Sequence, residues 1–173
     1  MMLRHDPIVE TRTLRWPDEA ACGKFAQHLA QQQPQQQAQQ QTTAALDNAF
    51  ITLHGPLGAG KTTFVRHLLR ALGVVGRIKS PTYAVLEPHR AGELAISHFD
   101  FYRFDDAREW ADAGFRDVFA APGLKLAEWP EKAAGALPEA DLALHIEPHD
   151  DGSRSVRAEA HTALGRKLLM RLP

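Results

Sequence analysis

Gly55-Pro-Leu-Gly-Ala-Gly-Lys-Thr62 matches the pattern G-x-x-x-x-G-K-[ST] at every fixed position, and this match indicates the class of fold. Phe50 to Leu53, just before it, is a β-branched and aromatic run that is typical of a buried strand. Thr63 to Leu72, just after it, carries apolar residues at helical spacing and stops at Gly73. The sequence therefore predicts a strand, a phosphate-binding loop and a helix in succession.

A loop of this kind binds phosphates because, without side-chain bulk, it can turn its backbone N–H groups toward one point, where the helix dipole adds positive charge. We expect a nucleoside triphosphate there, with Lys61 reaching its β- and γ-phosphates and the Thr62 hydroxyl holding Mg²⁺. The expected nucleotide contacts in this segment are Gly55, Leu57, Gly58, Ala59, Gly60, Lys61, Thr62 and Thr63. An ordinary glycine-rich turn is the alternative, but it leaves Lys61 and Thr62 unexplained.

The composition limits the class of protein. The chain has 173 residues, 44% of them apolar, which suits one domain with a core, and its formal net charge of -1 gives no electrostatic footprint for nucleic acid. Cys22 is the only cysteine, so no internal disulfide can form. Met1 to Asp6 leads into no apolar segment, so neither secretion nor membrane insertion is indicated and we expect a cytoplasmic protein.

A glutamine-rich tract interrupts the chain before the phosphate-binding loop. Nine of the eleven residues from Gln31 to Gln41 are Gln, and such a tract cannot bury apolar surface. We therefore expect a disordered insertion at 31–41 within a single domain that spans residues 1–173.

Hydrophobic periodicity predicts the rest of the fold. The expected elements are a strand from Ile8 to Leu14, a helix from Pro17 with Cys22, Phe25, Ala26 and Leu29 on one face, strands at Tyr83 to Leu86, Leu94 to Phe99, Leu124 to Ala127, Leu142 to Ile146 and Ser155 to Ala160, and a helix from Thr162 to Leu172 with Arg171 in its last turn. A turn expected at Pro88 to Gly92 makes a β-hairpin, whose strands are antiparallel. We therefore predict an α/β, three-layer fold of the P-loop NTPase kind, with a mixed central sheet flanked by helices.

Two carboxylates are expected beside the metal. Asp100 and Glu128 each follow an apolar run that is predicted to be a strand, so both should emerge at the carboxyl ends of strands. Open α/β sheets bind their ligands at those ends. Each acid could face Mg²⁺, or each could be a solvated charge that closes a strand.

Two further residues bear on the chemistry. Thr82 follows Pro81 in a position where nucleotide switches sense the γ-phosphate through a hydroxyl, although the segment could also be an ordinary turn. His98 lies two residues before Asp100, and we expect a hydrogen bond between them rather than a metal cluster.

The only asparagine is Asn48, which precedes the loop, so the Asn-Lys-x-Asp element common in guanine-specific proteins is missing. ATP is therefore the predicted nucleotide.

Several motifs follow one another along nearly the whole chain outside the glutamine tract. They are Gly55-Pro-Leu-Gly-Ala-Gly-Lys-Thr-Thr63, Lys79-Ser-Pro-Thr-Tyr83, His98-Phe-Asp-Phe-Tyr-Arg103, Gly114-Phe-Arg-Asp117, Glu128-Trp-Pro130 and Leu137-Pro-Glu-Ala-Asp141. The first motif alone is shared with many unrelated NTPases, but the ordered set is specific. In this set the chain resembles the bacterial TsaE family, also called YjeE, the ATPase of tRNA threonylcarbamoyladenosine synthesis.

The resemblance implies an activity and partners. It implies a small Mg²⁺-dependent ATPase that docks on the TsaB and TsaD pair, where a threonylcarbamoyl group is transferred to the adenosine following the tRNA anticodon. The ATPase would not perform the transfer itself, and it would meet tRNA only through that complex.

The resemblance also implies roles for individual residues. Thr62 and Glu128 would hold Mg²⁺, and Asp100 would be needed for hydrolysis. Ser80 and Thr82 would belong to a switch-like segment. Trp129 would lie beside the nucleotide, with ordinary apolar packing of its ring as the alternative. Further nucleotide contacts are implied at Glu19 and Arg154. We therefore expect catalysis to depend on Lys61, Asp100 and Thr82.

The sequence departs from the family pattern at two places. The insertion at 31–41 lengthens the link that follows the helix of Glu19, and Arg108-Glu-Trp-Ala-Asp112 stands where the family has an acidic, leucine-rich stretch.

Two other functions stay open. A small-molecule kinase would use the same loop but would add an acceptor pocket and usually a basic lid. A nucleotide-dependent binding module would bind ATP with negligible turnover.

Overall fold

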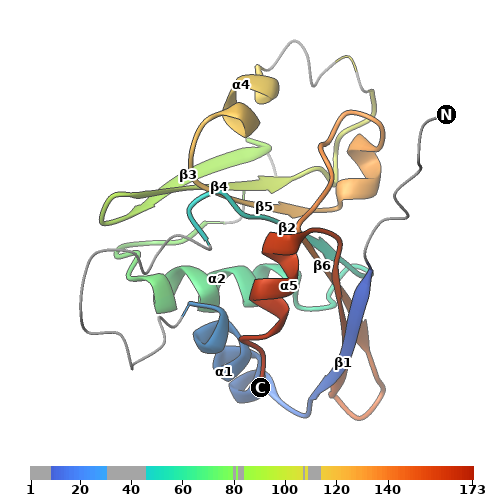
Figure 1. Cartoon of the computed structure of the whole chain (residues 1–173). Coiled ribbons are helices and arrows are strands. Elements are labelled where there is room, and N and C mark those ends of the chain that lie inside the picture. The colour runs from blue at the N-terminus through green and yellow to red at the C-terminus, as the bar shows by residue number, and fades with distance from the viewer. Residues whose placement is uncertain (1–8, 31–45, 80, 82–83, 107, 109–113) are drawn as a thin grey trace, which may run out of the picture.

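The computed structural model describes residues 9–30, 46–79, 81, 84–106, 108 and 114–173. The strands are β1 (Glu10–Trp16), β2 (Phe50–His54), β3 (Leu86–Ala91), β4 (Leu94–Asp100), β5 (Leu124–Glu128), β6 (Leu142–Pro148) and β7 (Arg154–Ala160). They form one seven-stranded sheet in the order β1-β7-β6-β2-β5-β4-β3 (Figure 1). The glutamine tract at 31–41 lies outside the described residues.

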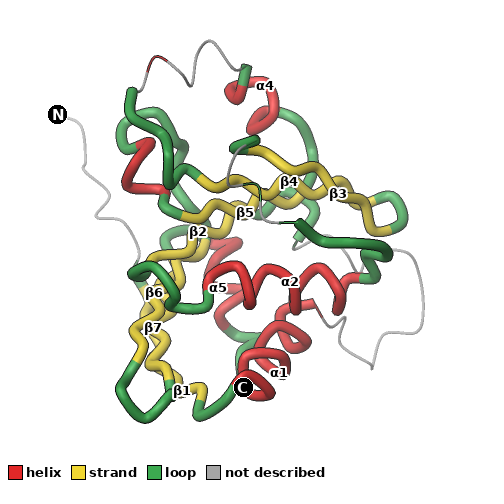
Figure 2. Tube along the Cα trace, turned by 180° about the vertical axis from the view of Figure 1, so that it is seen from behind, coloured by secondary structure: helices red, strands yellow, loops and turns green. Residues whose placement is uncertain are grey.

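Helices cover both faces of this sheet. They are α1 (Glu19–Ala30), α2 (Lys61–Leu72), α4 (Phe115–Ala120), the 3-10 helix η1 (Pro130–Ala133) and α5 (Ala163–Leu169). Figures 1 and 2 show α1, α2 and α5 gathered on one side of the sheet and α4 on the other. The predicted α/β fold, with a mixed sheet between layers of helices, is confirmed.

Alternating side chains of the strands build two separate cores. Ile51 and Leu53 of β2 belong to the larger core, on the face covered by α1, α2 and α5. Phe50 points to the opposite face and joins the smaller core, to which Phe115 of α4 and Ala133 of η1 contribute. The helical face predicted at Cys22, Phe25, Ala26 and Leu29 is buried in the larger core, as expected.

The direction of the strands sets where ligand-binding groups meet. Strands β4, β5, β2 and β6 run parallel to their neighbours in this order, whereas β7, β1 and β3 pair antiparallel. Asp100 at the end of β4 is the register partner of Glu128 at the end of β5. The loop that follows β2 starts at the same edge, so parallel pairing brings both acids to the phosphate-binding loop.

Several predicted boundaries were wrong, and the hairpin differs most. Its first strand was expected at Tyr83 to Leu86 and its turn at Pro88 to Gly92, but β3 runs from Leu86 to Ala91 and includes Pro88. A proline is tolerated there because β3 is the edge strand, where its missing N–H removes no bond from an inner ladder. Tyr83 itself lies outside the described residues.

Two further differences concern the ends of the chain. The first strand, β1, ends at Trp16 rather than Leu14, and its expected start at Ile8 lies outside the described residues. The closing helix α5 ends at Leu169, so Arg171 lies beyond it and donates from Nη1 to the Leu29 carbonyl oxygen at 3.0 Å. This bond holds the C-terminal segment against α1. Each helix in the described part of the chain is too short or too polar to span a lipid bilayer.

Asp141 joins β2, β6 and α5 at the edge opposite the phosphate-binding loop. Its carboxylate accepts from the Phe50 N–H at 2.8 Å and from the Thr162 hydroxyl at 2.6 Å. Thr162 in turn caps α5 by accepting from the Gly165 N–H at 3.0 Å. A Cβ on Gly165 would lie 1.8 Å from the Asp141 carbonyl oxygen, so α5 can dock only without a side chain there.

Gly165→Ala therefore tests the docking of α5. In an exposed helix, alanine is better than glycine by about 1 kcal/mol. Here we expect the sign to reverse, with a loss of about 1 to 3 kcal/mol in the free energy of unfolding, because overpacked sites are strained. Urea denaturation of Gly165→Ala and wild type measures this difference in the free energy of unfolding.

Gly23→Ala in α1 is the matched control, because the nearest atom to its Cβ is the movable ring of His67 at 3.2 Å. A Gly165→Ala protein as stable as the wild type would show that α5 does not pack as described.

Candidate nucleotide-binding site

The loop from Gly55 to Gly60 connects β2 to α2 and depends on its glycines. Gly55 has φ 151°, and a Cβ there would come within 2.5 Å of the Ile146 carbonyl oxygen. Gly60 has φ 105°, a left-handed conformation, and caps the N-terminus of α2. Leu57 is 75% exposed at the tip. The loop thus has the strand, tight turn and helix N-terminus that a phosphate site requires.

Lys61, in the first turn of α2, is folded back onto this loop. Its ammonium donates to the carbonyl oxygens of Gly55 at 2.6 Å and Pro56 at 2.9 Å, and it lies 4.2 Å from the centre of the Trp129 ring. Burial lowers the pKa of the Lys61 ammonium, and the charge of Glu128 opposes this shift. The ammonium therefore has weak carbonyl and ring partners that phosphate oxygens can replace.

Thr62 follows Lys61 and contacts an acid of the sheet. Its hydroxyl donates to Glu128 Oε1 at 2.7 Å, and His98 Nε2 lies 2.6 Å from the other oxygen, Oε2. Glu128 is 2% exposed and His98 is fully buried. The sequence predicted a hydrogen bond between His98 and Asp100, and this prediction was wrong. The His98 ring instead bonds Glu128 on the neighbouring strand β5.

Asp100 ends β4 beside this pair of residues. Its Oδ1 accepts from the Tyr102 N–H at 3.0 Å, and the side chain is buried. Burial raises the pKa of the Asp100 carboxyl, the Tyr102 hydrogen bond opposes this shift, and the charge of Glu128 adds to it. Two carboxylates with different surroundings thus stand at adjacent strand ends.

Trp129 closes this side of the site. It has φ 55° and ψ 47°, a left-handed conformation that costs a non-glycine residue roughly 1 to 3 kcal/mol. Its ring lies over the Lys61 ammonium and 5.0 Å from the ring of Tyr102. The strained backbone thus places a partly buried indole between the Lys61 ammonium and the edge of the smaller core.

Arg154, at the start of β7, contacts the other side of the loop. Its Nε donates to the Ala59 carbonyl oxygen at 2.6 Å, so a residue 95 positions away in sequence holds the loop. It also borders a small cavity of about 90 Å³ next to the loop. The residues that line this cavity are Trp16, Asp18, Glu19, Cys22, Gly60, Thr63 and Arg154. Glu19 and Arg154 are thus brought together beside the phosphate-binding loop.

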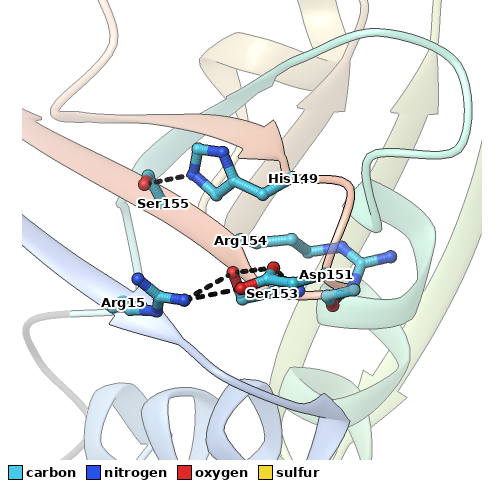
Figure 3. Close-up of polar contacts among 7 residues, drawn as sticks. Arg15, His149, Asp151, Ser153, Arg154 and Ser155 are labelled. Carbon is cyan, nitrogen blue, oxygen red and sulfur yellow. Dashed lines mark hydrogen bonds and ion pairs between the residues drawn. The ribbon is translucent and has the colours of Figure 1, made fainter.

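The turn between β6 and β7 fixes the position of Arg154. Figure 3 shows Arg15 pointing from β1 toward Asp151 and Ser153 in this turn, with Arg154 leaving the same turn. Arg15 Nη2 lies 2.9 Å from Asp151 Oδ2 and 3.0 Å from Ser153 Oγ, and Asp151 also accepts from the Ser153 N–H at 2.9 Å. Sequence reasoning missed Arg15 and Asp151, although Asp-Gly-Ser at 151–153 is a turn signal.

Two predicted residues are not placed. Ser80 and Thr82 lie outside the described residues, so their switch role stays a prediction.

The oxygen atoms that the structure brings together fit Mg²⁺, which prefers hard oxygen ligands and binds through one or two carboxylates together with substrate phosphates. Thr62 and Glu128 bring a hydroxyl and a carboxylate to one point. In the described part of the chain, no group of three or more His, Cys, Asp or Glu side chains could hold a metal ion by itself.

A group of histidines lies on the same sheet outside the phosphate site. The rings of His54 and His145 stack at 4.4 Å, and Glu159 lies 3.4 Å from both His145 and His161. Burial and, to a smaller extent, the charge of the neighbouring His145 together lower the pKa of His54 from 6.5 to about 4. The pKa of His145 is also lowered, mainly by burial.

The chain is similar to known proteins along most of its length. The family model "Threonylcarbamoyl adenosine biosynthesis protein TsaE" matches residues 16–156. The protein named tRNA threonylcarbamoyladenosine biosynthesis protein TsaE in Haemophilus influenzae is 37% identical over 161 residues, covering 93% of this chain and 97% of that one. Its namesake in Bacillus subtilis is 34% identical over 120 residues, covering 69% and 73%. The crystal structure of Bacillus subtilis YdiB has the same fold, with a TM-score of 0.73 at 24% identity over 95% of both chains.

The pKa of His54 predicts a pH dependence of stability. The unfolded chain takes up a proton near pH 6.5, whereas the folded one resists it down to about pH 4, so stability falls as the pH drops through this window. We expect His54→Gln to lose less of its melting temperature between pH 7 and 4.5 than the wild type does. His28→Gln, at an exposed histidine, is the control. Parallel losses in His54→Gln and wild type would refute the assignment.

The contact between Trp129 and Lys61 predicts an optical signal. Because ATP should draw the Lys61 ammonium away from the indole, we expect its addition to change the intrinsic fluorescence of the wild type. The change should vanish in Trp129→Phe and persist in Trp110→Phe. If the response survives in Trp129→Phe, Trp129 does not report on the site.

Proposed function

Because this chain belongs to the TsaE family of threonylcarbamoyl adenosine biosynthesis proteins, we propose that it is a Mg²⁺-dependent ATPase that supports tRNA threonylcarbamoylation in the cytoplasm. The contact between the Thr62 hydroxyl and the Glu128 carboxylate carries the proposal. It joins a phosphate-binding loop to an acid at a strand end, which is the arrangement that P-loop NTPases use.

Binding would begin with an exchange of partners at Lys61. The ammonium leaves the carbonyl oxygens of Gly55 and Pro56 and bonds the β- and γ-phosphates, which are stronger partners because they are charged. The backbone N–H groups of the loop and the N-terminus of α2 hold the remaining phosphate oxygens. Arg154 keeps the loop in place through its hydrogen bond to Ala59. Arg154 and Glu19 both line the small cavity beside the loop, where they could make further contacts with the nucleotide.

Thr62 and Glu128 would hold Mg²⁺. The ion, when bound, neutralises charge that develops on the phosphate oxygens during transfer. Asp100 would orient the attacking water and take up its proton. The hydrogen bond from the Tyr102 N–H holds the direction of its carboxylate. Burial raises the pKa of this carboxyl, which makes the carboxylate a stronger proton acceptor than that of an exposed aspartate.

We propose that hydrolysis serves a protein complex rather than a small acceptor. The relatives are named for threonylcarbamoyladenosine biosynthesis, and we expect docking on TsaB and TsaD homologues. The formal net charge of -1 supports contact with tRNA only through that complex. In this proposal ATP binding and hydrolysis reset the complex between rounds, while the transfer itself takes place on the partners.

Two substitutions should separate binding from hydrolysis. Lys61→Ala removes a phosphate ligand, so we expect the Kd for ATP to rise at least about tenfold. Asp100→Asn removes the water-orienting base, so we expect kcat to fall about 100-fold or more while the Kd stays within a factor of about three. Binding is measured by titration, and turnover by phosphate release with and without a TsaB and TsaD pair.

Lys167→Ala and Glu147→Gln, at exposed positions on α5 and β6, are the matched controls. Equal losses of ATP binding in Lys61→Ala and Asp100→Asn would contradict the division of roles. A wild type that binds ATP but hydrolyses none, alone or with the partners, would leave a binding module.

A further inference from the structure

We propose that His98 is a positioning residue, which orients the Glu128 carboxylate so that Glu128 and Thr62 together bind the metal form of the nucleotide. The inference rests on the proposed function, because it concerns the same site. It goes beyond that function by assigning a task to a fully buried residue whose hydrogen bond is to Glu128.

The geometry is a chain of two hydrogen bonds through one carboxylate. His98 Nε2 lies 2.6 Å from Glu128 Oε2, and the Thr62 hydroxyl donates to Oε1 at 2.7 Å. An ionised carboxylate only accepts hydrogen bonds, so His98 must carry its proton on Nε2 to make this bond. Three elements, β4, β5 and α2, thereby meet at Glu128.

Glu128 needs a second donor to hold one orientation. The last torsion of a glutamate side chain is broad, so a single bond from Thr62 to Oε1 leaves the plane of the carboxylate free to turn. The bond from His98 to Oε2 fixes that plane. This matters for metal binding, because groups behind a metal ligand that set its orientation typically contribute 10- to 100-fold in affinity.

The burial of His98 argues against a role in packing alone. The residue is fully buried, and within the described residues its Nδ1 has no hydrogen-bond partner. An imidazole in such a place loses the hydrogen bonds that it makes in water, whereas an apolar side chain of similar size would fill the space without that loss. The bond to Glu128 is the contact that compensates for this loss.

The experiment compares the effect of Mg²⁺ on ATP affinity among His98 variants. The Kd for ATP is measured by titration with Mg²⁺ and again with EDTA, and thermal unfolding checks that each variant is folded. In His98→Phe, which keeps a ring but has no donor, we expect at least about a tenfold loss of the Mg²⁺-dependent gain in affinity. The Kd in EDTA should stay within a factor of about three, and His98→Gln, which can donate at a similar reach, should recover part of the gain.

A double-mutant comparison separates positioning from a general disturbance. If His98 acts through Glu128, then His98→Phe should cause no further loss of the Mg²⁺ effect in a Glu128→Ala protein. Additive losses would overturn the inference. So would a folded His98→Phe protein with the wild-type Mg²⁺ effect, and if that variant does not fold, the same result in a folded His98→Leu protein, which also has no donor, would do so. A wild type whose ATP affinity ignores Mg²⁺ would instead refute the proposed function.

Discussion

The site is organised around the hydrogen bond between the Thr62 hydroxyl and the Glu128 carboxylate. This bond spans 66 positions in sequence and 2.7 Å in space, and it joins the first turn of α2 to the end of β5. Parallel pairing of β5 with β2 and β4 brings Glu128 to the loop and sets Asp100 beside it. The two acids, the hydroxyl and the loop therefore share one edge because the central strands run in the same direction.

The phosphate-binding loop and its lysine, Lys61, are held by different kinds of contact. Arg154 bonds the loop from β7, and its own turn is fixed by Arg15. Lys61 is different, because it rests on carbonyl oxygens and on the indole of Trp129. A loop held by Arg154, with a lysine whose partners can be exchanged, suits the proposed binding and release of a charged ligand.

The sequence was sufficient for features that depend on local patterns. Strand, loop and helix around Gly55 to Thr62 follow from glycine spacing and periodicity, and both Asp100 and Glu128 could be placed at strand ends because each closes an apolar run. Features set by pairing between distant strands were out of reach. The partner of His98 depends on the packing of β4 against β5, and Pro88 fits in β3 only because that strand forms the edge of the sheet.

A crystal structure of this chain with Mg²⁺ and a non-hydrolysable ATP analogue would show whether Thr62 and Glu128 hold the metal. We expect a metal ion about 2.1 Å from the Thr62 Oγ1, with Glu128 beside it in the same shell. We also expect the Lys61 ammonium to have moved from the Gly55 carbonyl oxygen to the β- and γ-phosphates. A nucleotide bound with its metal away from Thr62 and Glu128, or with Lys61 still on the loop carbonyls, would contradict the account.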